Sequence, residues 1–118
     1  MKTSPALAVA AALAAASLIH PGAASAHDWV VNSTPAENST GPAPTQVSVT
    51  FNEPVTHAQV WVVGPDGAVW SAGGLNGSGS SYTIAMRPSP PPGQYVVHWR
   101  DTAADGDDVY GGWSFNIN

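Results

Sequence analysis

The 118-residue chain contains no cysteine, and this absence removes several kinds of chemistry at once. A disulfide framework, a thiolate zinc site, an iron–sulfur cluster and a cysteine nucleophile are all excluded. Basic residues are also scarce, because only 3 lysines and arginines stand against 8 aspartates and glutamates, giving a formal net charge of −5. Nucleic acids and anionic membrane surfaces attract clustered basic residues, so this balance argues against both as partners.

Recognisable catalytic motifs are missing as well. The sequence has no nucleophile elbow, no His-Glu-x-x-His pair and no glycine-rich phosphate loop. Much of the remaining chemistry therefore depends on 4 histidines and a few carboxylates. We expect a binding protein rather than an enzyme.

The first 26 residues have the order of a secretory signal peptide. Lys2 precedes an alanine- and leucine-rich stretch over residues 6–19, and Ala24-Ser25-Ala26 offers a small-residue cleavage site. The apolar stretch is short for a transmembrane helix and no second one follows, although a retained N-terminal anchor is the alternative. We expect a signal peptide over 1–26 and one domain over 27–118, exported to the periplasmic space or the extracellular medium without membrane insertion of the mature chain.

Alternation of apolar and polar residues dominates the chain from residue 46 onward. The apolar members of each run share one face: Val47, Val49 and Phe51; Ala58, Val60 and Val62; Tyr82, Ile84 and Met86; Tyr95, Val97 and Trp99; Trp113, Phe115 and Ile117. Turns rich in glycine and proline separate these runs, and no segment has an apolar helical stripe. The pattern predicts an all-β fold, a single Greek-key antiparallel β-sandwich of the immunoglobulin-like or cupredoxin-like kind. The glycine- and serine-rich stretch 71–81 is predicted to be a flexible loop.

Cleavage after Ala26 would make His27 the first residue of the mature chain. Its α-amine and imidazole could then chelate one metal ion without help from the fold. Their ordinary pKa values of about 7.7–8 and about 6.5 allow both groups to lose a proton near neutrality, as metal binding requires. Nitrogen-rich tetragonal sites with some oxygen suit Cu(II). A single histidine is a weak signal, however, and its position after a cleavage site could be accidental.

The other candidate residues are less informative. His57 and His98 occupy outward positions of predicted strands, where a solvated histidine is the usual state. The segment 101–108 holds four aspartates in a turn between two strands, but their spacing does not match a calcium loop, and a solvated Asp/Gly turn is the alternative. Trp61 and Trp70 could form a stacking platform for sugars.

Several short motifs also stand in a characteristic order along residues 27–118. They are His27 directly after the leader, Ser33-Thr34-Pro35-Ala36-Glu37-Asn38, Phe51-Asn52-Glu53-Pro54-Val55, the turn Gly64–Gly67, and then Gly93, Tyr95, Val97, Trp99, Asp105, Gly106, Gly111 and Phe115. No single motif is specific, but their order and spacing together resemble the CopC-type family of small exported copper-binding proteins.

This resemblance implies a β-sandwich that holds Cu(II) at one end, through an N-terminal histidine and the Asp and His of an Asp-Gly-His motif. The first two positions correspond to His27 and Asp105, but the third is Asp107, so one imidazole is missing. Asp107 could bind through oxygen, His98 could take its place, or the site could be lost or adapted. We favour Asp107, because Cu(II) accepts mixed nitrogen and oxygen ligands. A methionine-rich Cu(I) site is not expected, since the chain after residue 26 has only Met86.

The function implied by the resemblance is sequestration or transport of Cu(II) in copper resistance or homeostasis, without catalysis. The implied partners are the copper ion and a membrane copper transporter or another copper-handling protein. The alternative is a non-catalytic surface-interaction or sugar-binding β-sandwich in which the copper site is lost. An oxidative copper enzyme with the same terminal histidine would need a second histidine close to the first.

Overall fold

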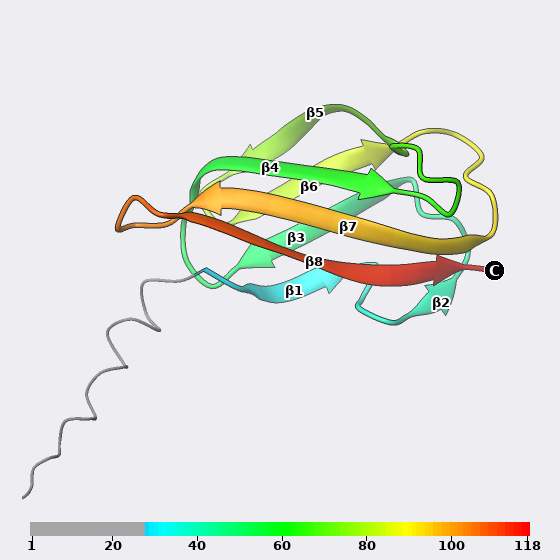
Figure 1. The fold of residues 1–118 in the computed structure, drawn as a ribbon, viewed down its shortest axis with the longest axis horizontal. Helices are drawn as coiled ribbons and strands as arrows, with labels where there is room; N and C mark the ends of the chain where they lie inside the picture. The colour runs from blue at the N-terminus through cyan, green and yellow to red at the C-terminus, as the bar shows by residue number, and fades with distance from the viewer. Residues whose placement is uncertain (1–27) are drawn as a thin grey trace, which may run out of the picture.

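The computed structural model describes residues 28–118, which form a β-sandwich of two four-stranded sheets (Figure 1). His27 and the expected leader lie outside the described residues. The strands are β1 (Val30–Thr34), β2 (Thr40–Gly41), β3 (Gln46–Phe51), β4 (Thr56–Val63), β5 (Ser71–Ser78), β6 (Ser81–Met86), β7 (Gly93–Thr102) and β8 (Asp108–Ile117). Within this part of the chain, no helix is long and apolar enough to span a membrane.

The chain passes repeatedly from one sheet to the other. The first sheet has the order β1-β3-β6-β5 and the second the order β2-β8-β7-β4. The connections from β3 to β4, from β4 to β5 and from β6 to β7 each change sheets, whereas β5–β6 and β7–β8 are hairpins. Every pairing is antiparallel except that of the short strand β2 with β8. The predicted antiparallel β-sandwich is thereby confirmed.

The residues predicted to share inward faces form the core between the sheets. Val62, Tyr95 and Val97 are completely buried, and Tyr95 stacks on Phe115 with ring centroids 5.6 Å apart. The Tyr95 hydroxyl donates a hydrogen bond of 2.6 Å to the carbonyl of Pro91. Every buried member of the described core lies between residues 47 and 117. Burial of this apolar surface between the two sheets is the main force that drives folding.

The prediction of a flexible loop over residues 71–81 is wrong. Residues 71–78 form β5, an edge strand that pairs with β6 and contains an irregularity between Ala72 and Asn76. Gly77 has a φ of 126°, and a side chain there would meet the carbonyl oxygen of Ser81 at 2.2 Å. Small residues thus permit the close turn into β6. The strand is formed by backbone hydrogen bonds and exposes most of its side chains, so hydrophobic alternation does not mark it.

Candidate metal centre

The beginning of the described chain and the β7–β8 turn lie at the same end of the sandwich (Figure 1). Two hydrogen bonds hold the first residues to the segment that follows β3. The Trp29 amide donates to Oδ1 of Asn52 at 2.8 Å, and the Asn52 amide donates to the carbonyl of Trp29 at 2.9 Å. These bonds fix the backbone immediately after Asp28, the residue that follows His27 in the sequence.

A pair of buried carboxyl groups, Asp28 and Asp101, is the most unusual feature of this end. Asp28 is 5% exposed and Asp101 1% exposed, and none of their four carboxyl oxygens has a hydrogen-bond partner outside the pair among the described residues. Burial, and after it a hydrogen bond with the carboxyl group of Asp28 and the charge of that group, raise the pKa of Asp101 from its ordinary value of 3.8 to about 7. Carboxylates buried without a partner are costly, so this pair must either retain a proton or receive a cation.

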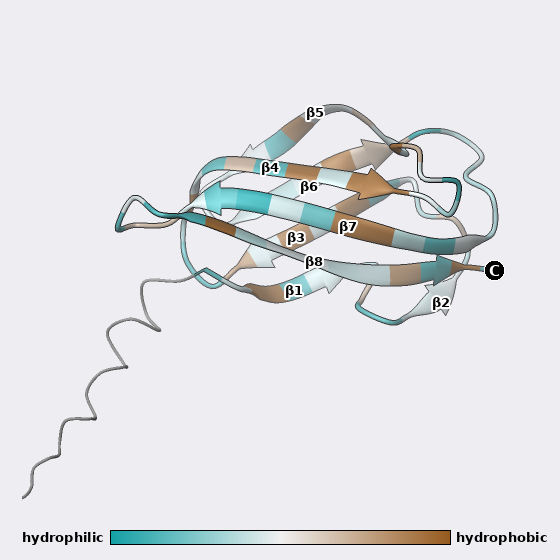
Figure 2. Ribbon diagram, in the orientation of Figure 1, coloured by the Kyte–Doolittle hydropathy of each residue, from teal (hydrophilic) through white to brown (hydrophobic). Residues whose placement is uncertain are grey.

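The alternation of β7 explains why Asp101 is buried. Tyr95, Val97 and Trp99 point into the sandwich, and Asp101 is the next residue of the same parity. Ala103, two residues further on, is also buried. Figure 2 shows the corresponding change along β7, whose middle is hydrophobic and whose end beside the β7–β8 turn is hydrophilic. The interior face of β7 therefore ends in a carboxyl group.

No arginine of the described residues pairs with these two aspartates. The Arg100 side chain forms an ion pair of 3.0 Å with Asp108 and lies over the ring of Tyr110. The Arg87 guanidinium lies 4.1 Å from the centre of the Trp70 ring and donates to a backbone carbonyl. Since residues 28–118 contain no lysine, no lysine or arginine of that range is left to pair with the two buried carboxyl groups. A divalent ion would fit the orphaned carboxyl oxygens in charge and in chemistry.

Asp105 and Asp107, the two predicted oxygen ligands, lie in the turn between β7 and β8. The turn is closed by hydrogen bonds from the Ala103 amide to the Asp107 carbonyl at 2.8 Å and from the Gly106 amide to the Ala103 carbonyl at 2.9 Å. Oδ1 of Asp105 accepts a 3.0 Å hydrogen bond from the Asp107 amide, and both residues are exposed. The structure thus brings these two aspartates together in one short turn.

No group of three histidines, aspartates or glutamates within residues 28–118 is close enough to hold a metal ion. The predicted set of His27, Asp105 and Asp107 includes a residue outside the described part, so this set stays a prediction. The buried pair likewise offers only two side chains. A further ligand would have to come from elsewhere in the chain.

His98, the alternative third ligand, lies on the outer face of β7. It stacks on Trp61 with centroids 5.4 Å apart and an interplanar angle of 16°, and β7 alternation gives it the opposite orientation to Asp101. His57 is exposed near the start of β4.

The two tryptophans considered for sugar binding are each partly covered, Trp61 by His98 and Trp70 by Arg87. The single methionine of the described range, Met86, is buried in the core.

Sequence reasoning missed the buried pair. It placed Asp101 in the turn with the aspartates after it, with a solvated Asp/Gly turn as one alternative, although the alternation that begins at Tyr95 already predicts an inward position. No comparable signal marks Asp28, which precedes the first strand. Glu53 was named only as part of a motif, yet its Oε2 is also buried without a hydrogen-bond partner among the described residues.

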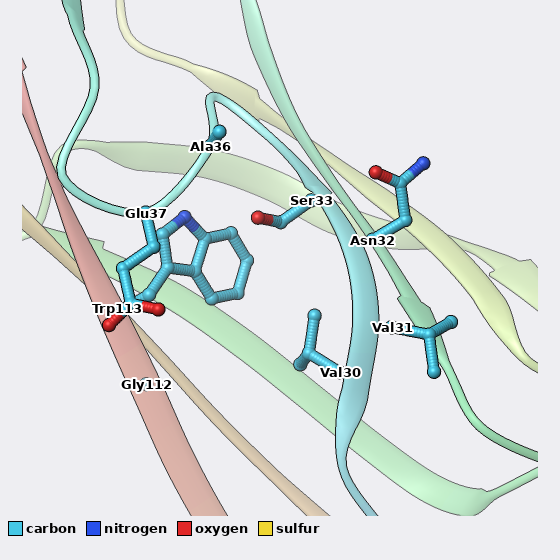
Figure 3. Close-up of a pocket in the computed structure, with 8 residues that line it drawn as sticks. All are labelled: Val30, Val31, Asn32, Ser33, Ala36, Glu37, Gly112 and Trp113. Carbon is cyan, nitrogen blue, oxygen red and sulfur yellow. The ribbon is translucent and has the colours of Figure 1, made fainter.

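A shallow groove lies between β1 and β8 (Figure 3). The Trp113 indole forms one wall, beside the Glu37 side chain, and its Nε1 donates a 2.8 Å hydrogen bond to the carbonyl of Pro35. Val31 and Asn32 border the groove but point away from its interior. Glu37 is the only carboxylate among the groove residues, so the groove does not form a metal site.

The fold and this end of the molecule define the class of protein: a small antiparallel β-sandwich with a carboxyl-rich end next to the start of its first strand. The CopC domain model matches residues 30–118. Copper resistance protein C of Pseudomonas syringae pv. tomato is 30% identical over 115 residues, which cover 89% of this chain and 91% of that protein. The chain therefore belongs to the CopC family.

Solved structures agree with this assignment at the level of the fold. CopC from Methylosinus trichosporium OB3b matches with a TM-score of 0.68 and 22% identity, over 78% of this chain and 94% of that one. PcoC, a methionine-rich copper resistance protein from Escherichia coli, matches with a TM-score of 0.65 and 23% identity, over 79% of this chain and all of the other.

Proposed function

We propose that this chain is an exported copper-binding protein that sequesters or carries Cu(II). Membership of the CopC family and the copper resistance function named for its relative in Pseudomonas syringae support the metal. The observation that carries the proposal is the carboxyl-rich end of the sandwich, where the described chain begins and where no arginine of residues 28–118 balances the buried charge. A divalent cation is the chemical complement of that arrangement.

The proposed nitrogen ligands are the α-amine and imidazole of His27, set free by cleavage after Ala26. The proposed oxygen ligands are Asp105 and Asp107, in the turn at the same end of the sandwich. Replacement of one imidazole by a carboxylate gives a mixed nitrogen and oxygen site, which Cu(II) tolerates. We expect its affinity for Cu(II) to be lower than that of a site with two imidazoles.

The proposed activity is binding without catalysis. The groove between β1 and β8 is shallow and holds a single carboxylate. The copper would be passed to, or received from, a membrane copper transporter or another copper-handling protein.

The experiment compares two forms of the protein that differ only at the N-terminus. The full chain is expressed with its leader, and mass spectrometry of the exported product should locate the cleavage after Ala26. Cu(II) titration of this product is then compared with titration of a chain that carries one extra glycine before His27. The extra residue moves the α-amine away from the imidazole, so we expect much weaker binding. Equal affinities, or a mature chain that begins elsewhere, would contradict the proposal.

A further inference from the structure

We propose that the free edge of β8 binds an extended, basic segment of a partner protein, which pairs with β8 as an added strand beside the groove between β1 and β8. This inference rests on the proposed function, because it identifies where the protein that exchanges copper with this chain would bind. The edge begins directly after the turn that holds Asp105 and Asp107, so a segment bound there would lie next to the proposed metal ligands.

The first argument is the free backbone of β8. The Asn38 amide donates a 2.7 Å hydrogen bond to the Ser114 carbonyl from the side opposite β7. Peptide groups alternate in direction along a strand, so Tyr110 and Gly112 direct their N–H and C=O groups to that same side. The strand on that side, β2, pairs only with residues 116–117. Among the described strands, none pairs with this side of β8 before Ser114.

The second argument is the regular register of this edge. The strands at the other three edges of the two sheets, β1, β4 and β5, each contain an irregularity in their pairing. In contrast, β8 pairs with β7 in unbroken register, and residues 109–113 include neither proline nor a charged side chain. Bulges, prolines and charges are the devices that keep an edge strand from pairing with another chain. This part of β8 lacks them, so it is suited to accept a strand.

The third argument is the space beside the edge. Gly112 and Trp113 form the β8 side of the groove, while Val30 and Ser33 of β1 form the other side (Figure 3). Since β1 is the edge strand of the first sheet, the groove separates the edges of the two sheets. Gly112 has no side chain, which lets a second backbone approach closely. A strand added to β8 would therefore direct alternate side chains into the groove.

The fourth argument is charge, which determines the kind of partner. Glu37 is the only charged residue that lines the groove, is exposed, and forms no ion pair within residues 28–118. All 8 acidic residues of the chain lie in that range, where arginine is the only basic residue type besides histidine. A second copy of this chain would bring like charge to the edge, whereas a lysine- or arginine-bearing segment is attracted to it. The charges therefore favour a basic partner segment.

The test uses two short synthetic peptides with blocked ends, Thr-Val-Lys-Val-Lys-Val-Thr and the same peptide with glutamate in place of both lysines. Each is titrated into the metal-free exported protein while NMR spectra follow the backbone amides. Tyr110→Pro removes an outward N–H and leaves the ladder with β7 its donors, because proline is tolerated where the N–H of an edge strand faces solvent. Tyr110→Thr is the matched control, since it keeps the N–H and loses the same ring. Glu37→Gln removes the charge, and circular dichroism checks that each variant is folded.

We expect the lysine peptide to shift the amides of Tyr110 and Gly112 most strongly and to bind more tightly than the glutamate peptide. Tyr110→Pro should weaken binding about tenfold, because a peptide carbonyl loses its donor, while Tyr110→Thr should stay within about threefold of the parent and Glu37→Gln should lose about twofold. The location of the shifts in the parent protein tests the edge independently of any variant.

Absence of shifts with the lysine peptide, shifts confined to another strand, or equal binding by the Tyr110→Pro and Tyr110→Thr proteins would overturn the proposal. Sedimentation velocity supplies a further check: a dimer of the parent that Tyr110→Pro dissociates would make a second copy the occupant and would also overturn it. Because these measurements use metal-free protein, they are separate from the Cu(II) titration, whose failure would instead refute the proposed function.

Discussion

Replacement of Asp101 by asparagine should stabilise the metal-free protein, and by an amount that depends on pH. The pKa of Asp101 is about 7 in the folded protein and 3.8 ordinarily. Because a tenfold change in proton affinity is worth about 1.4 kcal/mol, the buried carboxyl group costs up to about 4 kcal/mol of folding free energy above pH 7. Burial of the polar asparagine amide beside Asp28 offsets part of this gain, so we expect a net gain of about 2 kcal/mol.

The pH range of this effect follows from the two pKa values. Below pH 3.8 the carboxyl group is protonated in both states and imposes no pH-dependent penalty. Between pH 3.8 and about 7 the unfolded chain releases the proton while the folded chain keeps it, so the stability of the parent protein falls as the pH rises. Above pH 7 both states have released the proton, and the penalty is constant.

The assay is urea unfolding of the metal-free parent and Asp101→Asn proteins between pH 4 and pH 8, in the presence of a chelator. The stability advantage of the variant should be small at pH 4, grow to neutrality and then level off. The Asp108→Asn control should show no such growth, because Asp108 is exposed. An advantage that is absent at pH 7.5, or as large at pH 4 as at pH 7.5, would refute the reasoning.

Three further predictions concern the core and the outer face. Gly111→Ala should destabilise the protein by about 1–3 kcal/mol in urea unfolding, because the added methyl group would lie 2.3 Å from Cζ2 of Trp99. Phe51→Ala should cost about 3–5 kcal/mol in the same assay, since Phe51 is 2% exposed and packs edge-to-face on Trp99; a loss below 1 kcal/mol would contradict that packing. His98→Ala should leave the Cu(II) affinity within twofold, because His98 stacks on Trp61 at the outer face; a tenfold loss would make it a ligand.

The sandwich was predictable because alternation is a direct consequence of strand geometry. Trp99 and Trp113 occupy the predicted inward positions, and each is 6% exposed. Alternation fails for β5, where exposed small side chains leave no hydrophobic pattern and the backbone pairing with β6 determines the structure. The short strand β2 could not be predicted from alternation either, because two residues cannot establish a period.

The candidate site was predictable only in part, for two physical reasons. Asp105 and Asp107 lie in a turn that the glycine and aspartate composition marks clearly. Composition places Asp101 in the turn with the aspartates after it, whereas its position in the alternation of β7 directs its side chain inward. The partner Asp28 is brought to Asp101 by long-range folding, which no local pattern encodes.

Pulsed electron paramagnetic resonance of the equimolar Cu(II) complex of the exported protein tests the central claim most directly, because it counts the imidazoles bound to copper. The proposed site contains the single imidazole of His27, together with its amine and carboxylate oxygens. We therefore predict the signal of one coordinated imidazole, lost in His27→Ala and kept in His98→Ala. A complex with no imidazole, or with two, would contradict the account.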